Sequence, residues 1–171
     1  VAIQNAPAFF GRGLTAEEIR ELVIQHPNIQ LIKGEGPVVD IAGVIERTEG
    51  RVPVFNGRGG LELVDNLRAG CRGMILAPDS IDYAVRAYEA FRQGDEAAAE
   101  REYQAMLPAV VFAMQGIENL LCYGKRLFGA RAGLAIYDRA PAMRPNAAGL
   151  AMVERFASAL GGLGCAGRAL S

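Results

Sequence analysis

The sequence predicts an α/β fold in which a parallel sheet alternates with helices over residues 1–94, followed by an all-helical segment over 95–160. Two observations carry this prediction. Short apolar runs alternate four times with helix-like segments across short connections, as is typical of parallel strands joined by right-handed crossovers. The runs are also continuously apolar, which is expected of strands covered on both faces. After Asp95 only helical patterns follow.

The first half contains the strands. Thr15 and Glu18 have the spacing of a capping box, which predicts a helix that ends near His26, before a proline. His26 itself is expected to be a surface residue at a helix end. The expected elements, in order, are a strand over 1–7, a loop over 9–13, a helix over 15–26, a strand over 29–35, a helix over 38–46, a strand over 52–57, a helix over 61–69, a strand over 71–76 and a helix over 81–92.

The second half is expected to consist of three helices and a flexible tail. Asp95 caps the first helix, and Pro108 ends it because a proline cannot continue a helix without losing a hydrogen bond. The expected segments are helices over 95–107, 110–127 and 145–160, a loop over 129–133, and a glycine-rich tail over 161–171.

Composition narrows the class of protein. The chain has 171 residues, of which 51% are hydrophobic and 22% charged, as in one globular domain with a sizeable core. The net charge of −1 argues against nucleic acid and against an anionic membrane as partners. No apolar run reaches the roughly 18 residues of a membrane span, and no signal-peptide pattern opens the chain.

The cysteines indicate a protein of a reducing compartment, and the single histidine argues against a metal site. The three cysteines, Cys71, Cys122 and Cys165, are far apart and odd in number, so we expect free thiols and a cytoplasmic location. One histidine and no CxxC or HxxxH spacing argue against a metal site.

Polar residues follow each predicted strand, and the most telling pair is Lys33 and Glu35. Alternate residues of a strand share a face, so these two side chains project the same way. A lysine at the end of an apolar strand is partly desolvated, and a neutral amine can attack a carbonyl and form a Schiff base. A carboxylate two residues on could then move a proton. The plain alternative is a strand-end lysine that reaches water beside an acidic neighbour.

Other strand ends supply candidate binding residues. The carboxyl ends of parallel strands meet at one edge of a sheet, where α/β proteins build their sites. We therefore expect Gln4 and Asn5 after the first strand and Asn56 and Gly57 after the third to bind substrate. The alternatives are a turn contact for the first two residues and a tight turn for Gly57.

Several short motifs together resemble the dihydrodipicolinate synthase / N-acetylneuraminate lyase family. Gln4-Asn5-Ala6-Pro7 is similar to its fifth-strand motif Tyr-Asn-x-Pro, and Ile32-Lys33 is similar to its sixth-strand Ile-Lys. Further similarities, in the expected order, lie at Asn56-Gly57, 69–75, Leu107-Pro108, Gly124-Lys125 and 139–141. The resemblance implies a TIM (β/α)8 barrel, of which this chain would hold strands five to eight over 1–94 and the C-terminal helical extension over 95–160.

The resemblance also implies chemistry and partners. Lys33 would form the Schiff base with a 2-keto acid of the pyruvate type, so no cofactor is expected. A half barrel leaves its sheet edges open. We therefore expect a fragment, a chain that pairs with a missing N-terminal half barrel, or a homo-oligomer such as a dimer or tetramer.

Two departures from the family pattern shift the expected reaction. Gln4 stands where the family has a proton-relaying tyrosine, and Phe9 stands where the synthases have an arginine for the second substrate. Gln4 with Lys33 and Glu35 instead resembles the branch of 2-keto-3-deoxy sugar acid dehydratases, such as L-2-keto-3-deoxyarabonate dehydratase, in which the glutamate is the acid and base. The alternatives are dihydrodipicolinate synthase or a pyruvate-dependent aldolase, and a non-catalytic half barrel or interaction module.

Overall fold

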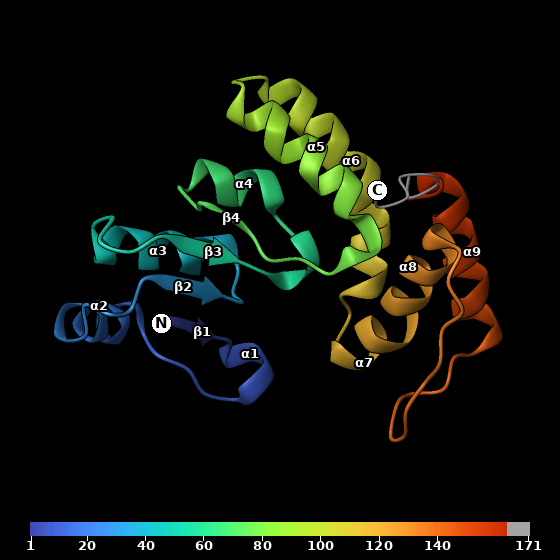
Figure 1. Cartoon of the computed structure of the whole chain (residues 1–171), viewed down its shortest axis with the longest axis horizontal. Helices are drawn as coiled ribbons and strands as arrows, with labels where there is room; N and C mark the ends of the chain where they lie inside the picture. The colour runs from blue at the N-terminus through green and yellow to red at the C-terminus, as the bar shows by residue number, and fades with distance from the viewer. Residues whose placement is uncertain (164–171) are drawn as a thin grey trace, which may run out of the picture.

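A computed structural model describes residues 1–163 and contains one parallel sheet with the strand order β1-β2-β3-β4. The strands are β1 (Ala2–Asn5), β2 (Leu31–Gly34), β3 (Val54–Asn56) and β4 (Gly73–Met74). Each is shorter than its predicted run but lies inside it. Figure 1 shows the sheet and helices α2 to α4 at one end of the molecule and α7 to α9 at the other, with α5 and α6 side by side between them.

The two faces of the sheet differ. Ile32 and Val54 lie side by side on the face that α2 (Ala16–Gln25) and α3 (Val38–Thr48) cover. Gln4, Lys33 and Phe55 lie in register on the other face, where none is fully buried within residues 1–163. The expectation that both faces are covered is therefore met on one face only in this part of the chain.

The start of α2 confirms the predicted capping box. The Thr15 hydroxyl accepts from the Glu18 backbone N–H at 3.2 Å, and the Glu18 carboxylate accepts from the Thr15 N–H at 2.7 Å. The bonds that the Thr15 N–H and the Thr15 hydroxyl donate to the Glu18 carboxylate lower the pKa of Glu18. A single helical turn, α1 (Pro7–Phe10), replaces the end of the predicted strand 1–7 and the start of the predicted loop 9–13, because a proline suits the first position of a helix.

The remaining elements of the first half follow the prediction closely. A short 3₁₀ turn, η1 (Arg58–Gly60), precedes α4 (Leu63–Arg68), and another, η2 (Pro78–Ser80), precedes α5 (Ile81–Arg92). The backbone of the η1 region is unusual, since Arg58 and Glu62 both have positive φ, at 52° and 58°. Such a conformation costs energy in residues other than glycine, and residues of this kind cluster at functional sites.

In the second half of the chain, the helix boundaries differ from the predicted ones. Helix α6 (Glu96–Ala113) continues through Pro108, where the prediction ended it. Met106, Ala109, Val110 and Ala113 are all buried along the same helix, so tertiary packing outweighs the lost backbone hydrogen bond.

The predicted helix 110–127 and loop 129–133 are also wrong. The chain breaks after α6 and resumes as α7 (Ile117–Asn119), a π-helical turn η3 (Leu120–Gly124) and α8 (Lys125–Ala132). Gly133, with φ of 69°, ends α8 in the left-handed conformation that glycine adopts readily. No single helix within residues 1–163 has the length and apolarity of a membrane span, although α6 and the run Ile117–Ala132, bent by 106° at the break, reach them as a pair.

The two halves share one of the two hydrophobic clusters. Leu63 and Val64 of α4 belong to the same buried cluster as Met106 of α6 and Leu127 of α8. The last helix, α9 (Ala147–Leu160), is capped by Asn146 and completes this cluster. The expected boundary between residues 94 and 95 therefore lies between α5 and α6, two helices that pack side by side and contribute to the same cluster.

The predicted flexible tail falls mostly outside the described residues. Of 161–171, the structure describes 161–163, and these pack against α8. The Leu163 N–H donates to the Arg131 carbonyl at 2.9 Å, and the Leu163 side chain is buried.

Candidate active site

The candidate site lies where β1, β2 and β3 end. Gln4 is the register partner of Lys33, and Lys33 is the register partner of Phe55, so the three side chains form one row across the open face of the sheet. Lys33 Nζ lies 2.8 Å from Glu35 Oε1, an ion pair in which the lysine side chain is 22% exposed and the glutamate side chain 9%. The amine is thus paired with its acidic neighbour, on a side chain that is still partly exposed.

Backbone groups on both sides hold Glu35. Its own N–H donates to the Asn5 carbonyl at 3.0 Å, which continues the pairing of β1 and β2 beyond the strand ends. Its Oε2 accepts from the Arg58 backbone N–H at 2.7 Å. One carboxylate oxygen is therefore fixed by the loop after β3, and the other faces the lysine.

A hollow of about 530 Å³ opens in front of this pair. Four of its lining side chains are polar, namely Gln4, Lys33, Glu35 and Arg58. The rest of the wall is mostly apolar and comes from α1, from the segment after β4 and from the break between α6 and α7, with Phe9, Phe10, Ile75, Leu76, Met114, Ile117 and Leu120. A volume of this size suits a small organic molecule.

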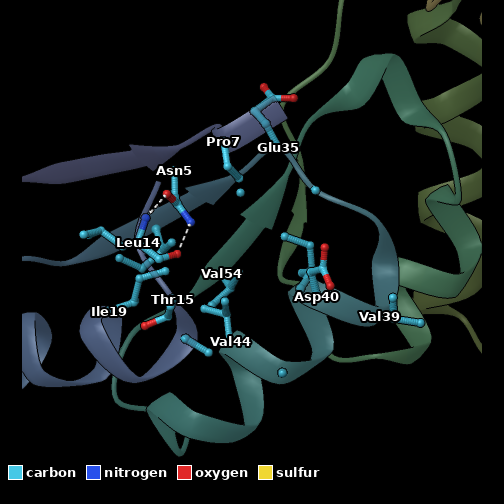
Figure 2. Close-up of a pocket in the computed structure, with 16 residues that line it drawn as sticks. Asn5, Pro7, Leu14, Thr15, Ile19, Glu35, Val39, Asp40, Val44 and Val54 are labelled. Atoms are coloured by element: carbon cyan, nitrogen blue, oxygen red, sulfur yellow. Dashed lines mark hydrogen bonds between the residues drawn. The ribbon is translucent and has the colours of Figure 1, made fainter. Parts of the chain in front are cut away.

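Asn5 lies on the other side of the sheet from Lys33. Its amide nitrogen donates to the Leu14 carbonyl and its amide oxygen accepts from the Leu14 N–H, both at 2.9 Å. Both halves of the amide are thus engaged in fixing the loop after α1. Asn5 borders a second hollow of about 370 Å³ between the sheet and helices α2 and α3 (Figure 2). The two bonds to Leu14 are the turn contact weighed as the alternative for Asn5, and its substrate-binding role stays a prediction.

Asn56 is likewise a structural residue. It is fully buried, and its amide nitrogen donates to the Gly36 carbonyl and to Asn66 Oδ1, each at 2.9 Å. Its amide oxygen accepts from the Gly57 N–H at 2.8 Å. Because every donor and acceptor of this side chain has a protein partner, Asn56 holds the loops after β2 and β3 together and does not face the hollow. The Gly57 N–H is engaged in this bond, and the role of Gly57 as a substrate ligand stays a prediction.

Four residues near the site were not singled out from the sequence. Asn66 of α4 orients Asn56. Asn66 lies three residues after the buried Leu63, so the helical spacing places its polar side chain on a buried face, and the sequence could have indicated this. Arg58 pairs with Glu62 at 2.8 Å. The Tyr103 hydroxyl of α6 accepts from the Glu62 N–H at 2.8 Å. The last contact joins segments far apart in the chain and has no local sequence signal.

Sequence comparisons give no match, either to a family model or to a curated protein. Structure comparison gives many. A Pseudomonas aeruginosa protein, provisionally assigned as a dihydrodipicolinate synthetase, is 25% identical with a TM-score of 0.83, over 94% of this chain and 55% of its own. The Escherichia coli prophage protein YagE of the dihydrodipicolinic acid synthase family, in complex with pyruvate, is 23% identical with a TM-score of 0.82, over 94% and 55%.

A third neighbour extends the range of named activities. The sialic acid aldolase of Ruminococcus gnavus is 20% identical with a TM-score of 0.78, over 93% of this chain and 54% of its own. The chain therefore spans a little over half the length of the structures it matches. Together with the parallel strands, this coverage defines the second half of a TIM barrel with its helical extension. The fold is that of the dihydrodipicolinate synthase / N-acetylneuraminate lyase family, as the motifs in the sequence indicated.

Proposed function

We propose that this chain carries the Schiff-base centre of a lyase that acts on 2-keto acids, with Lys33 as the nucleophile and Glu35 as the acid and base. The observation that carries the proposal is the contact of 2.8 Å between Lys33 Nζ and Glu35 Oε1 at the floor of the hollow. A nucleophile and a base within hydrogen-bond reach are the usual signature of covalent catalysis. The named neighbours support it, since one was solved with pyruvate and another is described as a catalytic lysine mutant.

The ion pair suggests how the imine forms. Glu35 takes a proton from the Lys33 ammonium, and the neutral amine attacks the C2 carbonyl of the keto acid. Glu35 then returns the proton to the C2 hydroxyl, which leaves as water, and a protonated imine remains. In this scheme Glu35 performs the proton relay that the family tyrosine performs, because the amide of Gln4 cannot titrate.

The proposed overall reaction is dehydration of a 2-keto-3-deoxy sugar acid. The protonated imine withdraws electrons and acidifies C3, so Glu35 can remove a C3 proton and deliver it to the departing C4 hydroxyl. Hydrolysis of the imine releases the product and regenerates Lys33. No separate cofactor is needed in this scheme. A cytoplasmic location and a second half barrel or a further copy of the chain as partner remain predictions.

The second candidate is aldol chemistry with pyruvate, which the named sialic acid aldolase and dihydrodipicolinate synthases favour. The two reactions differ in the bond that breaks. We suggest incubating the full chain with 2-keto-3-deoxy sugar acids and identifying products by mass spectrometry. Loss of one water supports dehydration, and release of pyruvate supports the aldolase. Lys33→Ala should abolish either reaction. No turnover with any of these acids, from a folded chain, would contradict both and favour a non-catalytic half barrel.

A further inference from the structure

The Glu35 carboxylate occupies a space that exists only because residue 57 is glycine. A Cβ atom at Gly57 would lie 2.3 Å from Glu35 Oε1 and 2.5 Å from both Cδ and Oε2. These separations are far below any real contact, so the carboxylate of Glu35 and a side chain at residue 57 exclude each other. The glutamate side chain is flexible at its far end and would be the group to move.

The same turn supplies a hydrogen bond to the carboxylate. The Arg58 N–H donates to Oε2 at 2.7 Å, on the side away from Lys33. A hydrogen bond from a backbone N–H to a carboxylate is charge-assisted and favours a single orientation of the acceptor. The Arg58 backbone has φ of 52°, an uncommon conformation for a residue with a side chain.

A buried amide holds this turn in place. Asn56 accepts from the Gly57 N–H and donates to the Gly36 carbonyl, so it ties the residue that faces the carboxylate to the residue that follows Glu35. Asn66 of α4 accepts from the second amide proton of Asn56 and fixes its orientation. The cradle is therefore anchored to a helix outside the sheet.

We propose that Gly57 and the Arg58 N–H form a cradle that positions Glu35 for proton transfer, with Asn56 as its support. Gly57 is thus a positioning residue that touches the acid and base and not the substrate. The proposal rests on the function proposed above and names what sets the geometry of its proton-transfer group. It predicts that in Gly57→Ala the imine still reaches its final extent, while removal of the C3 proton by Glu35 is slowed.

The test separates these two steps. Pyruvate bound as an imine exchanges its methyl protons with solvent only if a base removes them, so transfer of deuterium from heavy water reports the base. The final extent of adduct trapped with borohydride reports the imine. We expect Gly57→Ala to lower the exchange rate at least about 10-fold, since general acid–base catalysis contributes roughly 10²–10⁴-fold. The final extent of trapping should stay within about 2-fold of the unaltered chain.

Gly36→Ala is the matched control, because a Cβ there would meet its nearest atom, the Asp40 Cβ, at an ordinary 3.7 Å. It should leave exchange unchanged. If Gly57 acts through Glu35, adding Gly57→Ala to Glu35→Gln should cause no further loss of exchange, whereas independent effects would multiply. Equal exchange rates in Gly57→Ala and Gly36→Ala, or multiplied losses in the double variant, would overturn the cradle.

A second measurement tests the positioning of Glu35 independently of any catalytic activity. In the full chain, hydrogen exchange of the Arg58 amide can be followed by NMR in heavy water. We expect this amide to exchange at least about 10-fold faster in Gly57→Ala and at the original rate in Gly36→Ala, because only the first change displaces its acceptor. If the unaltered chain traps no pyruvate, the proposed function fails, and this comparison alone upholds or overturns the positioning of Glu35.

Discussion

The buried arginine that joins the two halves of the chain allows a quantitative prediction. The Arg131 side chain of α8 is fully buried, and it donates two hydrogen bonds, of 3.0 and 2.8 Å, to the Asp82 carboxylate of α5. It also donates to the carbonyls of Asp79, Gly161 and Leu160. Removing one partner of a buried pair costs about 3–5 kcal/mol. Because Asp82 remains about a quarter exposed and can be rehydrated, we expect roughly 3 kcal/mol for Arg131→Met.

The effect should depend on pH in a defined direction. Burial acts to raise the pKa of Asp82, but the hydrogen bonds and charge of Arg131 outweigh it and hold this pKa below its usual value. A lowered pKa in the folded state contributes stability above the unfolded value of about 3.9, and this contribution is lost as the pH falls through the folded pKa. The difference between Arg131→Met and the unaltered chain should therefore shrink below about pH 4.

Thermal unfolding followed by circular dichroism measures this effect. For a chain of this length about 3 kcal/mol corresponds to a decrease in Tm of roughly 6–12 °C near neutral pH. Arg47→Met is the control, since the Arg47 side chain is 63% exposed and lies 3.8 Å from Glu17. It should cost less than about 1 kcal/mol. A loss for Arg131→Met that matches the control, or one equally large at acid and neutral pH, would refute the reasoning.

Three further predictions concern buried groups. Asn66→Ala leaves an amide proton of Asn56 without a partner and should destabilise by about 1–3 kcal/mol in urea unfolding, so an unchanged midpoint would contradict the network. Burial raises the pKa of Asp79, so its ionised form destabilises the folded state as the pH rises; Asp79→Asn should raise Tm near neutral pH by about 2–4 °C, and the gain should vanish in acid. Burial raises the pKa of the Cys71 thiol to about 11, so iodoacetamide should alkylate it far more slowly in the folded than in the unfolded chain, as peptide mass spectrometry can show.

Local patterns made much of the fold predictable. The capping box at Thr15 and the apolar runs through Ile32 and Val54 report on neighbouring residues, and each element they predict is present. The local rule that a proline ends a helix fails at Pro108. The helix continues there because Met106 and Val110 are packed in the core, and the sequence around the proline does not reveal this packing. The break after α6 has the same origin.

The site was predictable where it lies within one strand. Alternation placed Lys33 and Glu35 on one face, and the structure brings them together. The roles of Asn5 and Asn56 were not predictable, because an amide at a strand end serves a loop or a ligand equally well until its partners are known. The Asn5 amide forms its hydrogen bonds with Leu14. The Asn56 amide forms its hydrogen bonds with Gly36, Asn66 and Gly57. The cradle under Glu35 depends on contacts between two loops, which the sequence of either loop does not show.

Mapping of a trapped pyruvate adduct tests the central claim most directly, because Lys33 and Lys125 are the two lysines of the sequence. The Lys125 ammonium lies outside the hollow, with Asp138 and the Tyr137 carbonyl as its partners. The full chain would be incubated with pyruvate and borohydride, digested and analysed by mass spectrometry, beside Lys33→Ala and Lys125→Ala. We predict one adduct, on Lys33, that persists in Lys125→Ala and disappears in Lys33→Ala. No adduct on the folded chain, or one that survives Lys33→Ala, would contradict the Schiff-base role of Lys33.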